Sequence, residues 1–274
     1  MKKSVVKLKL GIVGCGVIGG RIALSVSNVL KQAFVITALY DIDLKKSAAL
    51  SQSLEIRRVV LNSIDEVIAA SDVVVECVNT ADAGMIIKKA LSAGKKVLAM
   101  SVGRVFTDKT IFSPVRGNRS DLFLPSGAIA GLDAVKAASL GGIKSLSLTT
   151  VKPPEGFKGN MFLEKKGIIL DKIQGDTVLF DGGVDEAVKK FPQNINVAAA
   201  LALASGGAKV RVRIIASPGS SKNSHEIVCI GASGTIRAVT ENVPCPDNPK
   251  TSYLAVLSGI QVLKQLSSQI KIGT

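Results

Sequence analysis

A glycine-rich turn directly after an apolar run constrains the fold of this chain more than any other feature. Gly14, Gly16 and Gly19 have the spacing G-x-G-x-x-G, with a predicted strand before them and a predicted helix after them. The first glycine permits a tight turn, the second lets the backbone approach a pyrophosphate, and the third lets the helix pack closely on the strand. Together with Val17 and Ile18, they predict a phosphate-binding loop for a dinucleotide. An ordinary strand–helix turn without a ligand is the alternative.

An acidic residue at the end of the next predicted strand indicates which dinucleotide the loop would hold. Asp41 follows residues 33–40, close to the position at which a carboxylate binds the ribose hydroxyls of a dinucleotide. A carboxylate there would repel a 2′-phosphate and therefore favours NAD, whereas Lys45 and Lys46 just beyond it leave NADP open. The alternative role for Asp41 is the N-cap of the following helix.

Strands and helices alternate through the first half of the chain. Strands are predicted at residues 5–13, 33–40, 58–61, 73–78 and 96–100, and helices at residues 21–31, at 85–93, and from Leu44 and Ser63. This alternation predicts an α/β fold in which residues 1–125 form a Rossmann doubly wound parallel sheet. Ligands bind at the carboxyl ends of such strands, so Asn79 and Thr80 are expected to contact the cofactor. Glu76 could face the same cleft and meet a substrate ammonium, or it could be a structural acid.

The pattern changes after Pro125. Strands are predicted at residues 145–151, 177–181, 209–216, 226–231 and 234–241, and helices at residues 130–140 and 196–205. Because strands outnumber helices, residues 126–250 are expected to form a C-terminal α+β domain with a mixed sheet and helices on one face. Residues 251–274 predict a C-terminal helix that packs back toward the Rossmann domain.

The composition limits the partners and the compartment. The chain has 35 Lys and Arg against 21 Asp and Glu, a formal net charge of +14, which favours anionic partners. The basic residues are scattered, and only two Tyr and eight Phe could stack on bases, so no nucleic-acid partner is expected. No apolar stretch reaches the ~20 residues that cross a bilayer, and no cleavage site follows the basic N-terminus. A cytoplasmic protein without a membrane partner is therefore expected.

One histidine and four cysteines limit the catalytic chemistry. Cys15, Cys77, Cys229 and Cys245 show no CxxC pair and no framework spacing, so free buried thiols and no metal site are expected. His225 is the one imidazole of the chain and lies between a Pro/Gly/Ser loop and a strand, where catalytic groups are often presented. A dehydrogenase that acts on a carbon bearing oxygen or nitrogen needs a proton acceptor. His225 fits that role, while a structural histidine, or Asp, Glu, Lys or Tyr as the base, stays open.

Segments over nearly the whole chain resemble the L-aspartate dehydrogenase family. They are residues 11–19, 74–77, 124–133, 151–154, 191–199, 225 and 246–252, in the order found in the family. The resemblance implies NAD(P)-dependent oxidative deamination of L-aspartate to iminoaspartate or oxaloacetate, a dihydrodipicolinate-reductase-like C-terminal domain, and a link to NAD biosynthesis. It also implies that His225 is the active-site acid/base. Ala128 and Asn196, or Asn194 in place of Asn196, would contact the nicotinamide end of the cofactor.

The same segments allow simpler local roles. Residues 126–128 are expected to open a helix, whose N–H groups could hold a carboxamide or a carboxylate. Asn194 and Asn196 precede an apolar helix and could cap it, and residues 248–252 could cap the last helix. A dicarboxylic substrate needs at least one cationic or multi-donor site, for which Lys250 is a candidate. The residues expected to bind this small amino-acid substrate are Ser126, Asn194, Lys250 and Thr251.

Two rival interpretations stay open. Another two-domain reductase, of the dihydrodipicolinate or homoserine type, would share this plan, although the first kind has a His-rich segment followed by Lys. A non-catalytic NAD-sensing protein would keep the Rossmann half but would have no need of His225. The open sheet expected in the second domain also offers a surface through which the chain could form a homodimer.

Overall fold

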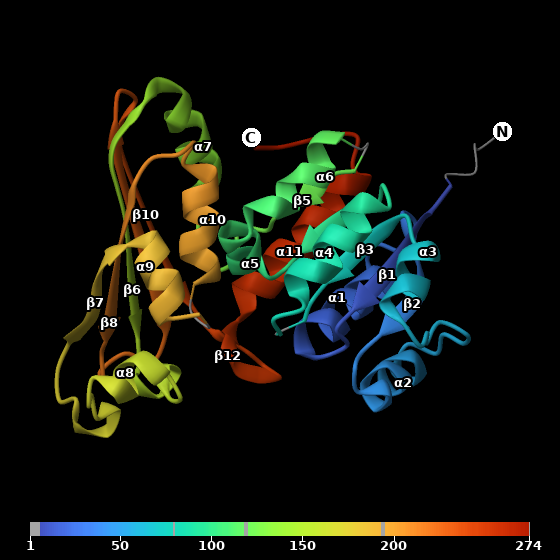
Figure 1. The fold of residues 1–274 in the computed structure, drawn as a ribbon, viewed down its shortest axis with the longest axis horizontal. Coiled ribbons are helices and arrows are strands. Elements are labelled where there is room, and N and C mark those ends of the chain that lie inside the picture. Colours follow the sequence, from blue (N-terminus) through green and yellow to red (C-terminus); the bar gives the residue numbers. More distant parts are fainter. Residues whose placement is uncertain (1–5, 79, 118–119, 193–194, 274) are drawn as a thin grey trace. The chain divides into compact units, whose positions relative to one another are not determined.

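Among the residues that the structure describes, two five-stranded sheets with their own helices organise the chain (Figure 1). This computed structural model describes residues 6–78, 80–117, 120–192 and 195–273. The chain divides into a first unit of Met1–Pro125 and Gly259–Lys271, and a second unit of Ser126–Ser258 and Ile272–Thr274.

The sheet of the first unit is parallel and has the strand order β2-β1-β3-β4-β5. Its strands are β1 (Leu8–Val13), β2 (Phe34–Tyr40), β3 (Val73–Glu76), β4 (Lys96–Ala99) and β5 (Leu122–Phe123). Leu39 of β2 also forms an isolated parallel bridge with Val60. The chain thus winds outward from β1 through β2 to Val60, and then crosses to β3 on the other side of β1, as in a Rossmann fold. The predicted doubly wound sheet is confirmed.

Helices cover both faces of this sheet. They include α1 (Val17–Asn28), α2 (Leu44–Ser53), α3 (Ile64–Ala69) and α4 (Ala83–Ser92). Leu10 and Ile12 of β1 are fully buried in one cluster with Ile22 of α1. Gly11 between them faces the other side, where a Cβ would lie 2.6 Å from Cγ1 of Val67 in α3. Successive residues of a strand point to opposite faces, so β1 has helices on both sides.

Three details of the first unit differ from the sequence-based expectation. Residues 58–61 form only the bridge at Val60, because Arg58 has a φ of +59°, outside the region of extended backbone. The helix expected at residues 21–31 begins earlier, at Val17. A helical stretch after β4 was not predicted, and it consists of α5 (Val102–Thr107), η1 (Lys109–Ile111) and α6 (Phe112–Gly117).

The sheet of the second unit is mixed, as predicted, and has the strand order β10-β9-β6-β8-β7. Its strands are β6 (Ile143–Lys152), β7 (Thr177–Gly183), β8 (Val210–Ala216), β9 (Asn223–Gly231) and β10 (Gly234–Asn242). Strands β6 and β8 pair in parallel, and the other neighbours pair antiparallel.

One face of this second sheet is covered by helices. Figure 1 shows α7 (Leu132–Gly141) and α10 (Asn196–Ala204) against it, and α9 (Val184–Lys190) contacts β7 and β8. Along β8, Val212 and Ile214 are buried whereas Arg211 and Arg213 are exposed. The alternation assigns the apolar side chains to the covered face and the charged ones to the open face.

Shorter elements complete the second unit. Between β6 and β7 lie η2 (Pro154–Phe157), α8 (Met161–Lys165) and η3 (Leu170–Lys172). After β10 come β11 (Pro244–Cys245), β12 (Asn248–Ser252) and the last helix, α11 (Tyr253–Ser267). Residues 248–252, which were expected to cap this helix, form a strand that pairs with β11 and ends directly before Tyr253. From Gly259 onward α11 belongs to the first unit, where Leu263 joins the buried cluster of β1 and α1.

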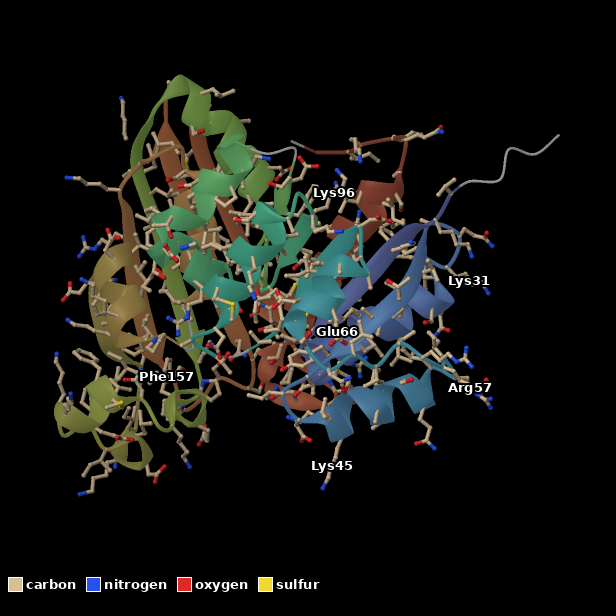
Figure 2. All side chains as sticks on the ribbon, turned by 45° about the vertical axis from the view of Figure 1, so that its right-hand side comes forward. Lys31, Lys45, Arg57, Glu66, Lys96 and Phe157 are labelled. Carbon is tan, nitrogen blue, oxygen red and sulfur yellow. The ribbon has the colours of Figure 1, made fainter. Side chains whose placement is uncertain are left out.

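Several basic side chains of the first unit are exposed, whereas Phe157 of the second unit is buried (Figure 2). Lys31, Lys45 and Arg57 are exposed at separate points of the first unit. In the second unit, Phe157 is 1 % exposed and meets the ring of Phe191 edge-on, with 6.3 Å between the ring centroids. No helix in the described part of the chain is long and apolar enough to cross a membrane.

Candidate functional site

Close backbone contacts shape the glycine loop after β1. Gly14 has a φ of +97°, and a Cβ on Gly19 would lie 1.9 Å from the carbonyl oxygen of Gly14. Neither position tolerates a side chain. A Cβ on Gly16, in contrast, would meet no protein atom within 4 Å. The protein itself does not require glycine at position 16, whereas a pyrophosphate approaching the backbone would.

The N-terminus of α1 lies at the same loop. The helix has 12 residues and begins at Val17, with Gly16 as an N-cap that offers no side chain and with no acidic residue in the first turn. The N–H groups of Val17, Ile18 and Gly19 therefore have no acceptor within the helix, and the helix dipole adds positive potential to them. This set of donors fits a phosphate group.

Asp41 follows β2 and is 8 % exposed. Its Oδ2 accepts a hydrogen bond from the N–H of Cys15 in the glycine loop (2.8 Å), and its Oδ1 accepts one from the N–H of Asp43 (2.9 Å). Asp43, not Asp41, is the N-cap of α2 and accepts from the N–H of Lys45, so the capping alternative for Asp41 is wrong. Because a carboxylate offers about four acceptor positions, Asp41 can still accept from ribose hydroxyls.

Glu76 connects two loops at the carboxyl end of the sheet. Its fully buried carboxylate accepts hydrogen bonds from the N–H of Val78 (2.9 Å) and from the N–H (3.1 Å) and the hydroxyl (2.8 Å) of Ser101. Burial raises the pKa of Glu76 to about 6, and the hydrogen bonds from Ser101 oppose that rise. Of the two roles that the sequence leaves open for Glu76, these bonds support the structural one.

Thr80 lies between β3 and α4, where the cofactor contact is predicted. Its hydroxyl accepts from the N–H of Asp82 (3.3 Å) and donates to Oδ2 of the same residue (3.2 Å). Thr80 is exposed, and Asn79, the other residue predicted here, lies outside the described residues.

All four cysteines are free, as expected, and three of them are buried. Burial, and after it the charge of Asp41, raises the pKa of Cys15 to about 12, and burial also raises the pKa of Cys77. A thiol whose pKa is raised forms little thiolate at neutral pH, so neither residue is a nucleophile.

His225 lies on β9 of the second unit and is 3 % exposed. It pairs in register with Thr150 of β6 on one side and with Thr240 of β10 on the other. Its Nδ1 lies 2.9 Å from Oγ1 of Thr150, the one hydrogen bond that the described residues give this ring. Burial, and after it the positive charge of Lys152, lowers the pKa of His225 to about 3. The ring is therefore neutral at physiological pH.

Lys152 is a further candidate site residue, which was not predicted from the sequence. It follows Thr150 by two positions on β6, so the two side chains point to the same face of the sheet. Burial lowers the pKa of Lys152 to about 8. The available sequence signal was its place in residues 151–154, a segment used only for the family resemblance.

Residues 126–128 form a turn, and the prediction that they open a helix is wrong. Gly127 has a φ of +70° and Gly131 a φ of +81°, so the right-handed helix α7 begins only at Leu132. The N–H of Gly127 instead donates to the hydroxyl of Ser258 (3.1 Å). Ser126 is half-buried in this turn.

The turn is fixed to the strand next to His225. The buried carbonyl of Ala128 accepts hydrogen bonds from the hydroxyl of Thr240 (2.8 Å) and from Nδ2 of Asn242 (2.9 Å), both on β10. Because Thr240 is the register partner of His225, Ala128 lies one strand away from the imidazole. The structure thus brings together two residues that are far apart in the sequence and were both predicted for the site.

The start of α10 lies against the same turn. A Cβ on Gly127 would be 3.6 Å from Cγ1 of Val197, the residue after Asn196. Asn196 is exposed and is the first residue of α10, and the N-cap is Ile195, whose side chain makes no capping hydrogen bond. Asn196 is therefore not the N-cap, and Asn194 lies outside the described residues.

Two further predicted substrate residues belong to β12. Thr251 is half-buried in this strand, which pairs with β11 just beyond the end of β10. The side chain of Lys250 lies outside what the structure describes. Within the described residues, no group of three or more His, Cys, Asp or Glu side chains could hold a metal ion.

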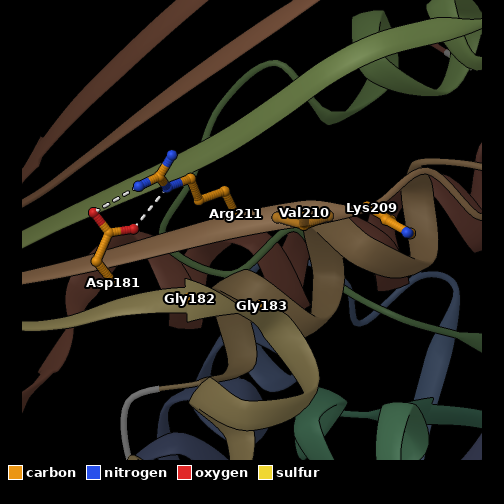
Figure 3. Close-up of a pocket in the computed structure, with 6 residues that line it drawn as sticks. All are labelled: Asp181, Gly182, Gly183, Lys209, Val210 and Arg211. Atoms are coloured by element: carbon orange, nitrogen blue, oxygen red, sulfur yellow. Dashed lines mark hydrogen bonds and ion pairs between the residues drawn. The ribbon is translucent and has the colours of Figure 1, made fainter.

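A hollow of about 340 Å³ lies at the other end of the second sheet (Figure 3). It is lined by Asp181 to Gly183 and by Lys209 to Arg211. Hydrogen bonds from Arg211, and then from Arg213, lower the pKa of Asp181 to about 2, so these charges satisfy one another. The hollow lies at the start of β8, whereas Lys152 pairs with Ala216 at the end of that strand, and we do not assign the reaction to it.

Comparisons with known proteins agree with this geometry. The family model described as "Aspartate dehydrogenase, C-terminal" matches residues 133–266, and the one described as "Homoserine dehydrogenase, NAD binding domain" matches residues 14–122. The L-aspartate dehydrogenase of Methanosarcina mazei is 41 % identical over 97 % of this chain and 100 % of its own length. That of Methanococcus maripaludis is 44 % identical over the same shares.

Solved structures show the same two-unit fold. The crystal structure of aspartate dehydrogenase from Thermotoga maritima has a TM-score of 0.72 at 27 % identity, and the match covers 98 % of this chain and 100 % of that one. A hyperthermophilic archaeal homoserine dehydrogenase in complex with NADPH, 14 % identical with a TM-score of 0.60 over 98 % and 99 % of the two chains, shares the fold. Because the chain is 41 % and 44 % identical to the L-aspartate dehydrogenases of Methanosarcina mazei and Methanococcus maripaludis over 97 % of its length, it belongs to the L-aspartate dehydrogenase family.

Proposed function

We propose that this chain oxidises L-aspartate with NAD(P) to iminoaspartate, which water converts to oxaloacetate and ammonia. The observation that carries the proposal is the buried, neutral His225 bonded to Thr150, within a unit that the aspartate dehydrogenase model matches. The oxidation removes a hydride from Cα and a proton from the amine. When bound, the oxidised nicotinamide accepts the hydride, so the protein must supply a group that accepts the proton.

His225 is the proposed proton acceptor, through Nε2. If Nδ1 carries the ring proton and donates it to Oγ1 of Thr150, the lone pair of a neutral imidazole lies at Nε2. The register of β6 and β9 fixes the position of the bonding oxygen. Thr150 thus holds the orientation of the ring, as expected of the group that bonds to the second nitrogen of a catalytic histidine.

We propose NAD as the preferred cofactor, with NADP accepted less well. The glycine loop and the start of α1 would bind the pyrophosphate, with Gly14, Gly16, Val17, Ile18 and Gly19 supplying the backbone. Asp41 would accept from the ribose hydroxyls and repel a 2′-phosphate. Asn79 and Thr80 remain proposed contacts of the cofactor.

The remaining site residues are proposals as well. Ala128 and Asn196 would orient the nicotinamide carboxamide, and support comes from the turn that lies between Thr240 and the start of α10. The residues proposed to bind the substrate carboxylates are Ser126, Asn194, Lys250 and Thr251.

The test is an absorbance assay for reduced nicotinamide with the purified chain, NAD or NADP, and a panel of amino acids. We expect reduction with L-aspartate, faster with NAD than with NADP. Reduction with L-homoserine but not with L-aspartate would select the rival reductase. Nucleotide binding without reduction by any substrate would select the NAD-sensing protein.

We further propose that the chain forms a homodimer through the open face of the second sheet. Val178, Ile230 and Val239 are 54 %, 42 % and 54 % exposed on its strands, and exposed apolar side chains on a sheet favour association. Light scattering during size exclusion should give twice the chain mass, and Val239→Lys should reduce it. A wild-type protein of single-chain mass would contradict this proposal.

The proposed place of action is the cytoplasm, because four free cysteines fit a reducing compartment. There, the iminoaspartate formed would be available to NAD biosynthesis.

A further inference from the structure

Lys152 and His225 share the covered face of the second sheet. Thr150 pairs with His225 in register, and Lys152 follows Thr150 by two positions, so all three side chains lie on one face near one end of the sheet. Buried neighbours on that face are apolar, such as Leu148 and Ile227. A lysine among these apolar side chains, next to a histidine, is not a residue that packing alone would favour.

The backbone and the side chain of Lys152 each lie against a neighbouring segment. Its carbonyl accepts a hydrogen bond from the N–H of Ser217 (2.9 Å), and a Cβ on Gly156 would lie 3.6 Å from both Cβ and Cδ of Lys152. Gly156 belongs to η2, which Phe157 anchors against Phe191. The backbone of Lys152 is therefore held at the end of β6, and η2 lies beside its side chain.

Few other charged side chains of the described residues lie near Thr150, Lys152 and His225. On β9 and β10, Glu226, Arg237 and Glu241 alternate onto the open face, and α10 has no charged residue. The helix that contacts β9, α7, carries Asp133 and Lys136, and η2, which lies beside Lys152, carries the exposed Glu155. The charge that acts on His225 is that of Lys152.

We propose that Lys152 binds a carboxylate of the amino-acid substrate and, by forming that ion pair, removes a repulsion that otherwise opposes proton uptake by His225. This inference rests on the proposed function and adds a residue to it. A cation beside a neutral imidazole disfavours protonation of the ring, and an anion paired with that cation cancels the effect. His225 thus becomes a competent base when an acidic substrate is bound.

The pKa values of His225 and Lys152 agree with this role. A histidine whose pKa is lowered to about 3 is a weak proton acceptor at neutral pH, and Lys152, with a pKa lowered to about 8, is still largely charged there. A substrate carboxylate beside this ammonium would form a charge-assisted hydrogen bond with it. With Lys152 beside His225, the site favours substrates that place a carboxylate next to Lys152.

The test uses the fact that the chain has one histidine, so the imidazole signals in an NMR spectrum come from His225 alone. The full chain, purified without a histidine tag and saturated with NADH, is titrated with pH in the presence of succinate or of uncharged succinamide. In the wild type, succinate should raise the titration midpoint of the ring, and succinamide should not. In Lys152→Met, the midpoint without ligand should be higher than in the wild type, and succinate should no longer move it.

Kinetics provide the second readout. With Lys152→Met the KM for L-aspartate should rise about 10- to 100-fold, the loss expected for one charged hydrogen bond, and Lys152→Arg should restore part of it. Lys144→Met, at the exposed start of the same strand, is the control and should change neither readout. A wild-type midpoint that succinate does not move overturns the proposal, even if Lys152→Met fails to fold, and so does an unchanged KM in a folded Lys152→Met. Failure of the proposed function is distinguishable, because the wild type would then not reduce NAD with aspartate at all.

Discussion

Oγ1 of Thr150 and Nδ1 of His225 lie 2.9 Å apart across two paired antiparallel strands. The two residues are 75 positions apart in the chain, and the sheet register alone brings them together. If Nδ1 is the donor in this bond, as proposed, Nε2 is the nitrogen that accepts a proton, and the roles of the two ring nitrogens can be tested separately.

Replacing Thr150 by Val should lower kcat for aspartate oxidation by about tenfold, because a lost orienting hydrogen bond of about 1.4 kcal/mol has that effect on a rate. Binding of NADH should be unchanged, since Thr150 is not among the residues proposed to contact the cofactor. Thr149→Val, one position earlier and on the open face, is the matched control. Equal kcat values for the wild type and Thr150→Val would show that the bond does not orient a catalytic ring.

Acid should destabilise the wild type more than a variant without the imidazole. The pKa of His225 is about 3 in the folded chain and 6.5 when unperturbed, so between these pH values the unfolded chain binds the extra proton. Stability therefore falls as the pH drops below about 6.5. Between pH 7 and pH 4.5, the wild type should lose about 2 kcal/mol more unfolding free energy than His225→Gln. Urea unfolding at both pH values measures this difference in unfolding free energy. Equal losses in the wild type and His225→Gln would show that burial does not lower the pKa of the ring.

The choice of cofactor should depend on the carboxylate of Asp41. Asp41→Asn keeps an acceptor for the N–H of Cys15 but removes the charge, so the ratio of kcat/KM for NADP to that for NAD should rise by on the order of tenfold. Asp43→Asn, at the exposed cap of α2, should leave the ratio unchanged. If Asp41→Asn and Asp43→Asn gave the same ratio, Asp41 would not be part of the ribose site.

Gly16 and Gly19 should respond differently to alanine. Gly16→Ala has room for its methyl group, so its Tm should stay near that of the wild type while the Kd for NADH rises at least about tenfold. Gly19→Ala places a Cβ against the carbonyl of Gly14 and should cost about 3 kcal/mol or more of stability. Gly20→Ala, where the nearest atom is 3.9 Å away, is the control for both. Unaltered NADH binding by Gly16→Ala would contradict a dinucleotide at this loop.

Local sequence patterns were sufficient for the parallel sheet and the glycine loop of the first unit. The glycine spacing, the apolar runs and the acid after β2 each depend on neighbours within a few positions, and they correctly predicted the parallel sheet and the loop. The capping alternative for Asp41 did not fit the predicted helix start at Leu44, because Asp43 directly precedes that residue and is the cap in the structure. Arg58 shows the limit of such patterns, since its positive φ interrupts a segment with apolar strand character.

The second unit depends on contacts between distant residues. Ala128 is held by Thr240, which is 112 positions later, so the turn at residues 126–128 resembled a helix start in the sequence. Lys152 was missed for the same reason, because its relation to His225 follows from the pairing of β6 with β9. His225 itself could be found because the chain contains no other imidazole.

The most direct test of the account compares wild type and His225→Gln in one experiment, with NAD and L-aspartate, measuring both reduced cofactor and released ammonia. We expect the wild type to form the two products in equal amounts. The variant should bind NADH normally and turn over about 10²–10⁴-fold more slowly, the usual effect of removing a positioned acid/base group. Undiminished turnover by a folded His225→Gln, or no reduction of NAD by the wild type with aspartate, would contradict it.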